Sequence, residues 1–118
     1  MKNQLNPFLS LFVSRCDDFA IQRPDGLYRR AGRALSPVEV YKHLTGEQTI
    51  GVYLISERGT CITAVFDSDD EENGLDSLHN VQEQLAHDGI ASYLEQSRRG
   101  GHLWVFLASP VLASRLRR

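Results

Sequence analysis

The apolar residues of this 118-residue chain occur in short segments whose spacing alternates between helical and strand-like. Glycines and prolines separate these segments, and no apolar run approaches the roughly 18 residues of a membrane-spanning helix. Short helices and strands in alternation favour an α/β (or α+β) protein with a mixed, partly antiparallel sheet flanked by helices. The hydrophobic fraction of 42% suits one core. We therefore expect a single domain over residues 1–118.

The helices are marked by apolar spacing and by end signals. The clearest start signal is Ser36-Pro37-Val38-Glu39, in which Ser36 suits the N-cap, Pro37 the first helical position and Glu39 a capping box. Gly46 and Gly89 are typical residues just beyond a helix end. The expected helices cover about residues 6–15, 37–44, 75–89 and 111–118.

The strands are marked by β-branched and apolar runs between turn residues. Residues 23–26 predict a tight turn that pairs two short strands, and residues 56–59 predict a second hairpin. The loop at 97–101 separates the last two strands. The expected strands cover residues 18–22, 27–30, 49–55, 60–66, 90–94 and 103–108.

The net charge of −2 conceals an uneven distribution of charge. Residues 67–95 carry nine acidic side chains and no lysine or arginine, whereas residues 96–118 carry five arginines and no acid. A uniformly basic nucleic-acid binder is therefore excluded. An acidic segment followed by a basic one suits a site for cations and phosphates together, although two solvated surfaces would give the same pattern.

The cysteines and the N-terminus indicate in which cellular compartment the protein is expected. Cys16 and Cys61 are too few for a disulfide framework and do not form a CxxC metal pair, so we expect both to be reduced, small buried groups. The N-terminus has no apolar signal segment. We expect a cytoplasmic protein that does not contact a membrane.

The first candidate site is the acidic run that follows the apolar strand 60–66. Asp67 and Asp69 are separated by one residue, and alternate residues of a strand point to the same face. Two adjacent carboxylates could bind Mg²⁺ or Mn²⁺, which prefer oxygen ligands. An acidic run before a helix is more often a solvated loop, so the spacing alone does not decide.

The second candidate site is the loop 97–101 with His102 at the start of the next strand. Gly100 and Gly101 would let backbone N–H groups approach an anion, and Arg98 and Arg99 suit phosphate oxygens. The alternative is an exposed surface loop beside a structural histidine. Metal-binding carboxylates and a phosphate-binding loop are complementary halves of a metal–nucleotide site.

The two motifs, in this order, resemble those of the archaeo-eukaryotic primase superfamily, and most closely its primase-polymerase branch in mobile-element, CRISPR-associated and conflict-system proteins. The Asp-x-Asp motif of the superfamily would be Asp67-Ser68-Asp69. Its small-x-His motif would be Gly100-Gly101-His102, before a strand that contains Trp104. Segments 19–26 and 43–53 resemble N-terminal landmarks of that branch, so the resemblance covers nearly the whole chain.

The resemblance implies a DNA primase-polymerase module that performs template-directed nucleotidyl transfer, either primer synthesis or primer extension. Asp67 and Asp69 would bind the catalytic Mg²⁺ or Mn²⁺, and His102 would contact the triphosphate of the incoming nucleotide. The implied partners are nucleoside triphosphates and a DNA template and primer. The loop residues that would assist in nucleotide binding are Ser97, Arg98, Arg99, Gly100 and Gly101.

One departure from the superfamily pattern concerns its third motif, a further acidic residue on a later strand. No aspartate or glutamate follows Glu95. We therefore expect an N-terminal fragment of a larger catalytic core, whose remaining half or a partner chain supplies the third carboxylate. The isolated chain is expected to have little or no polymerase activity. Whether Asp70 joins the metal site stays open.

Two other functions are compatible with the same residues. One is a non-catalytic nucleotide- or nucleic-acid-binding module of the same fold that acts with a partner. The other is a metal-dependent nuclease, which would need a further acid or a lysine, and both lysines are remote in sequence. Arg29, Arg30 and Arg33 could contact a DNA backbone or simply lie on an exposed hairpin. For Trp104, core packing is favoured over base stacking.

Overall fold

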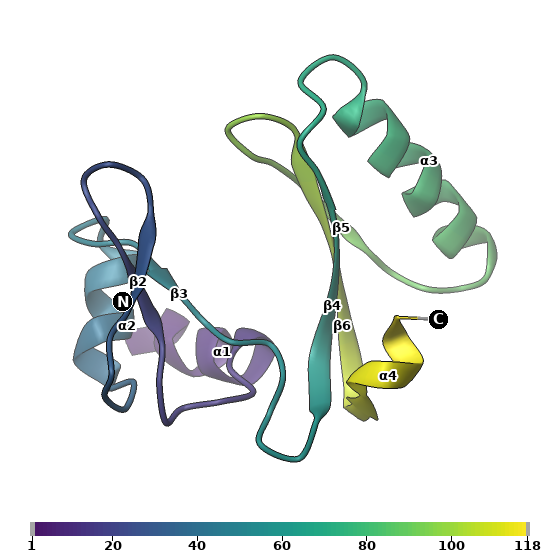
Figure 1. Ribbon diagram of the computed structural model, residues 1–118. Helices are drawn as coiled ribbons and strands as arrows, with labels where there is room; N and C mark the ends of the chain where they lie inside the picture. The colour runs from purple at the N-terminus through teal and green to yellow at the C-terminus, as the bar shows by residue number, and fades with distance from the viewer. Residues whose placement is uncertain (1, 118) are drawn as a thin grey trace. The chain divides into compact units, whose positions relative to one another are not determined.

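The computed structural model describes residues 2–117, with side chains from Leu5 onward (Figure 1). The chain divides into two compact units, one formed by the residues up to 62 together with those from 110 onward, the other by residues 63–109. The elements are, in order, α1 (Lys2–Phe12), β1 (Ala20–Gln22), β2 (Tyr28–Arg30), α2 (Pro37–Leu44), β3 (Ile50–Gly51), β4 (Thr60–Ser68), α3 (Gly74–His87), β5 (Tyr93–Gln96), β6 (Gly101–Leu112) and α4 (Ala113–Leu116).

The first unit is built on a three-stranded antiparallel sheet in the order β2-β1-β3. Ile21 of the central strand lies opposite Arg29 on one side and Ile50 on the other. Phe19, Val40 and Ile50 form the buried core, and apolar side chains of α1 and α2 pack against it. Burial of this apolar face, more than helix propensity, stabilises two helices as short as these.

A buried carboxylate joins the two strands of the first hairpin. Asp18 is only 3% exposed, and its Oδ1 accepts hydrogen bonds from the backbone N–H groups of Phe19 and Gly32, each at 2.9 Å. Its other oxygen accepts from the Arg30 guanidinium, which together with these bonds lowers the pKa of Asp18. Arg33 lies over the Phe19 ring at 5.3 Å and pairs with Glu39. Arg30 and Arg33 thus have partners within the protein.

Helix α2 starts where the sequence predicts, but without the expected capping box. Ser36 occupies the N-cap in extended conformation and makes no side-chain capping bond. The Glu39 carboxylate instead accepts from Arg33 at 2.6 Å and from the Gln48 amide. These two donors draw the carboxylate away from the helix start. The capping-box prediction is therefore wrong, whereas the prediction that Gly46 follows the helix end is confirmed by its φ of 81°.

The second unit contains parts of a sheet whose strand order is β4-β6-β5, with helix α3 alongside it (Figure 1). Strands β5 and β6 are antiparallel, and Glu95 lies opposite His102 in their register. Leu103 and Val105 of β6 are buried, as is Leu78 of α3. A Cβ atom at Gly101 would lie 2.8 Å from a methyl carbon of Leu75, so α3 covers this face closely.

The α/β fold class is confirmed, but the strands form two three-stranded sheets instead of one. The hairpin expected between residues 49–55 and 60–66 is wrong: β3 has two residues and pairs with β1, whereas β4 pairs with β6. The turn at 56–59 does form, with a 2.9 Å bond from the Gly59 N–H to the Ser56 carbonyl.

Several element boundaries also differ from the prediction. Helix α1 begins and ends earlier than residues 6–15, and the C-terminal helix is limited to Ala113–Leu116. Strand β5 begins at Tyr93 and includes Glu95, whereas β6 extends from Gly101 through Pro110 to Leu112. Within residues 2–117, no helix has the length and apolar character needed to cross a membrane.

Candidate functional site

The acidic strand end and the Gly/Arg loop meet through their backbones. A Cβ atom at Gly100 would overlap the carbonyl oxygen of Ser68 and lie 3.3 Å from the Cα atom of Asp69. A Cβ atom at Gly74, the first residue of α3, would lie 2.9 Å from the Ser68 hydroxyl and 3.5 Å from the Gly100 Cα. The first residue of α3 and the distant loop residue Gly100 therefore both pack against Ser68.

This contact changes the interpretation of the loop glycines. Gly100 and Gly101 are both buried, and neither has a positive φ. Their lack of a side chain leaves room for the Ser68 backbone on one side and for Leu75 and the Glu95 carbonyl on the other. The glycines are thus needed for close packing.

Asp67 and His102 lie next to each other in this unit. Asp67 is near the end of β4, and His102 is the second residue of β6. The Nε2 atom of His102 is 3.5 Å from Oδ1 of Asp67. The Asp67 side chain is 58% exposed and the His102 side chain 33% exposed, so both can meet a ligand from solvent.

The two acids that follow Asp67 differ in their environment. Asp69 lies just beyond β4 and is exposed. The Oδ1 atom of Asp70 accepts hydrogen bonds from the backbone N–H groups of Glu72 and Asn73, at 3.0 and 3.1 Å. These bonds lower the pKa of Asp70. The Asp70 carboxylate thus shapes the turn into α3, where it has a structural role.

The sequence analysis missed Glu95, which contacts the candidate histidine. Its Oε1 lies 2.6 Å from Nδ1 of His102 and 3.3 Å from the indole nitrogen of Trp104. A signal for it was present. If the four residues 97–100 form the loop, counting outward pairs residue 96 with 101 and residue 95 with 102, which is the observed register. Trp104 is half-buried, with its ring 6.4 Å from the parallel ring of Phe106.

The arginines of the loop border a separate depression of about 380 Å³. One wall comes from the loop and the end of β5, and the other from the acidic start of α3. Neither Asp67 nor His102 lines it, although Gly100 both lines it and packs on Ser68. The lining residues are Glu71, Glu72, Leu75, Asp76, Gln96, Ser97, Arg98, Arg99 and Gly100.

The donor set at the end of β4 suits a hard divalent cation in chemical type but is small. Asp67 and Asp69 offer exposed carboxylate oxygens, and Mg²⁺ is commonly held by one or two carboxylates with water and phosphate oxygens completing its shell. Within the described part of the chain, no group of three or more acidic, histidine or cysteine side chains is placed to hold a metal ion. The residues fit an open site shared with a phosphate ligand.

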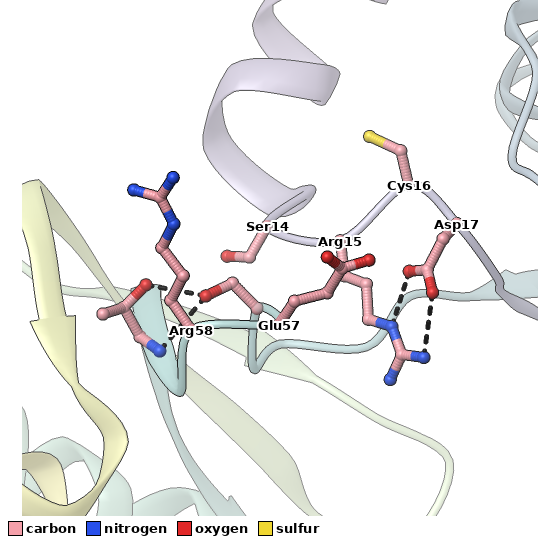
Figure 2. A pocket seen from close by; sticks show the side chains of 8 residues that line it. Ser14, Arg15, Cys16, Asp17, Glu57 and Arg58 are labelled. Carbon is pink, nitrogen blue, oxygen red and sulfur yellow. Dashed lines mark hydrogen bonds and ion pairs between the residues drawn. The ribbon is translucent and has the colours of Figure 1, made fainter.

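A second pocket, of about 320 Å³, lies in the first unit and contains none of the predicted site residues (Figure 2). Arg15 at its edge forms a two-point ion pair with Asp17, at 2.6 and 3.0 Å. Cys16 also lines it and is exposed, so the expectation that both cysteines are buried holds only for Cys61. The pairing with Asp17 leaves Arg15 little free charge for a ligand.

Comparison with known proteins gives one family. Residues 23–118 match the family described as the archaeo-eukaryotic primase domain of the TOTE conflict system. The matched segment includes both candidate motifs. No curated protein matches the chain.

Proposed function

The chain belongs to the archaeo-eukaryotic primase domain family of TOTE conflict systems, and from this premise we propose that it binds a metal–nucleoside triphosphate for nucleotidyl transfer. Membership places it among primase-like nucleotidyltransferase domains. The proposal adds a DNA template and primer as substrates, and Asp67, Asp69 and His102 as the catalytic residues.

The observation that carries this proposal is that the Asp-x-Asp motif and the Gly-Gly-His motif lie side by side in the second unit. Nε2 of His102 approaches Asp67 to 3.5 Å, while Gly100 packs directly on the backbone of Ser68, between the two aspartates. A cation-binding carboxylate and a phosphate-binding histidine that act on one metal–triphosphate ligand must lie in the same small site, and Asp67 and His102 do.

Each group would have a distinct part in binding. Asp67 and Asp69 would hold Mg²⁺ or Mn²⁺, which would neutralise and align the phosphate oxygens. His102, in its charged form, would donate from Nε2 to a triphosphate oxygen. Arg98 and Arg99 carry forked guanidinium groups that suit the remaining phosphate oxygens, with Ser97 and the loop backbone beside them.

A second function, a non-catalytic nucleotide- or nucleic-acid-binding module acting with a partner, is favoured by one observation. Among residues 2–117, no group of three or more histidine, cysteine, aspartate or glutamate side chains is placed to hold a metal ion. Binding would need only this pair, whereas transfer would need a further acidic ligand from outside the chain described here.

Calorimetric titration of the purified chain with dATP in Mg²⁺ tests the binding site. Wild type should bind, and Asp67→Asn and His102→Ala should each weaken binding by about tenfold, because each removes one charged contact to the ligand. Replacing dATP with dAMP should weaken binding too, since the proposed contacts are to the outer phosphates.

The matched controls are Asp88→Asn and His79→Ala. His79 lies on the surface of α3, and Asp88 directly follows the last residue of that helix. Both are exposed and belong to the same unit as the candidate site. These variants should bind dATP as wild type does. Absence of Mg²⁺-dependent dATP binding by folded wild type, or an equal loss in the controls, would contradict the proposed site.

A further inference from the structure

Glu95 and His102 form a cross-strand pair on the hairpin made by β5 and β6. They lie directly opposite each other in the antiparallel register, so their side chains project from the same face of the sheet. The Oε1 atom of Glu95 is 2.6 Å from Nδ1 of His102. The Glu95 side chain is 55% exposed, so burial does not explain why it lies against His102.

The same carboxylate oxygen holds a second ring in place. The Trp104 indole N–H donates to Oε1 of Glu95 at 3.3 Å. Trp104 follows His102 by two residues on β6, so both side chains lie on one face, with ring centroids 6.0 Å apart in an edge-on arrangement. Glu95 therefore accepts hydrogen bonds from two neighbouring rings. The bond to each ring limits how far the Glu95 side chain can rotate away from the other ring.

A carboxylate can only accept a hydrogen bond, so Nδ1 of His102 must carry its hydrogen toward Glu95. The other ring nitrogen, Nε2, is 3.5 Å from Asp67 Oδ1, and it donates to that oxygen or to a phosphate oxygen in the charged form of the ring, which carries a hydrogen on both nitrogens. A partner on one ring nitrogen commonly fixes both the tautomer and the orientation of a functional histidine.

We infer that Glu95 is a positioning residue for His102: it holds the hydrogen on Nδ1 and directs Nε2 toward Asp67 and the nucleotide phosphates. This inference rests on the proposed function for the identity of the ligand. The hydrogen-bond arrangement itself does not depend on any ligand and can be measured in the free protein.

The test is long-range ¹H–¹⁵N NMR of the histidine rings in the ligand-free chain, assigned with His102→Gln. Wild-type His102 should show a hydrogen fixed on Nδ1. In Glu95→Ala, this pattern should give way to the Nε2–H form, which is the favoured tautomer of a free neutral imidazole. Glu95→Gln, whose amide oxygen can still accept, should retain part of the wild-type pattern.

The single tryptophan of the chain provides an independent signal. Its one indole N–H resonance should shift in Glu95→Ala and shift less in Glu95→Gln. The matched control is Glu83→Ala, which removes the carboxylate 3.3 Å from Nε2 of His79 on α3. That change should leave both the His102 pattern and the indole resonance unchanged.

The functional arm repeats the dATP titration in Mg²⁺. Glu95→Ala should weaken binding by about tenfold, the size typical of losing a residue that orients a ligand-binding histidine, with partial recovery in Glu95→Gln. The inference is overturned if wild-type His102 carries a hydrogen on Nε2 and none on Nδ1, or if Glu95→Ala binds dATP as tightly as wild type. If wild type binds no dATP while the tautomer pattern is as expected, the proposed function fails and the positioning by Glu95 stands.

Discussion

At the scale of single residues, Gly100 links the two motifs of the candidate site. The sequence analysis predicted that Gly100 lets the backbone approach a bound anion, whereas in the structure Gly100 packs closely against Ser68. The two explanations predict different consequences of adding one methyl group. If Gly100 faces a phosphate, the added methyl group would weaken nucleotide binding. If Gly100 is closely packed, the methyl group would first lower the free energy of unfolding.

Gly100→Ala should therefore lower the free energy of unfolding by about 3 kcal/mol, the upper range for overpacking, because the new carbon overlaps a backbone carbonyl that cannot rotate away. Urea denaturation followed by circular dichroism measures this. The control is Gly51→Ala, whose Cβ would meet the Tyr28 ring at 3.5 Å, an ordinary contact. It should stay within about 1 kcal/mol of wild type. Equal stability of the two variants would contradict the packing role.

At the scale of elements, the start of α2 separates what a local signal specifies from what tertiary contacts decide. Ser36 and Pro37 do mark the helix start, and the backbone follows the prediction. The Glu39 side chain does not, because Arg33 and Gln48, six and nine residues away in sequence, compete for its carboxylate.

Substitutions at the two capping-box positions should consequently have unequal effects. Ser36→Ala removes no side-chain hydrogen bond and should cost less than about 0.5 kcal/mol. Glu39→Ala removes a nearly buried acceptor of two bonds and should cost about 1.5 kcal/mol. Thermal denaturation of both variants checks this. A working capping box would reverse the order and make the Ser36 change the more costly one.

The same distinction explains how far the sequence predicts the fold. Local signals located α2, α3 and the turn at 56–59, each defined by residues within one or two turns of chain. The partner of β4 was missed because strand pairing depends on contacts between distant segments, which no local pattern encodes. A hairpin is the default for adjacent apolar runs, and here β3 pairs with β1.

The candidate site follows the same rule. Asp67 and His102 could be singled out because each ends or begins an apolar strand beside charged or glycine residues. Glu95 was missed because the predicted strand stopped at residue 94 and the predicted loop extended to Gly101, whereas a loop of residues 97–100 gives the register that pairs residue 95 with His102. Asp70 could not be assigned before its bonds to the Glu72 and Asn73 N–H groups were known.

At the scale of the whole molecule, the distribution of paired charge bears on what the chain can do with DNA. Four arginines of the first unit form ion pairs with acids of that unit: Arg15 with Asp17, Arg23 with Asp25, Arg30 with Asp18 and Arg33 with Glu39. An arginine that is already neutralised releases few counterions from DNA, so it adds little to affinity. This pairing favours the structural interpretation of the basic hairpin over the DNA-backbone one.

The small number of carboxylates at the candidate site leads to a prediction for polymerase activity. Two-metal transfer uses acidic ligands to hold the cations that align the attacking and leaving oxygens. The chain offers Asp67 and Asp69, and no acid follows Glu95. The purified 118-residue protein should therefore bind dATP in Mg²⁺ yet extend a primed template by less than about one nucleotide per hour, far below the roughly one per second or faster of ordinary enzymes.

A gel assay with labelled primer, in Mg²⁺ and separately in Mn²⁺, measures this, with Asp67→Asn to identify contaminating polymerase. Product that is equal in wild type and Asp67→Asn comes from a contaminant and agrees with the prediction. Sustained extension by wild type that disappears in Asp67→Asn would contradict it, since the aspartate pair would then suffice for transfer. Because dATP binding is measured on the same preparation, failure to extend can be separated from failure to bind. Retained binding without turnover would show that the isolated chain lacks a component of transfer and not the nucleotide site.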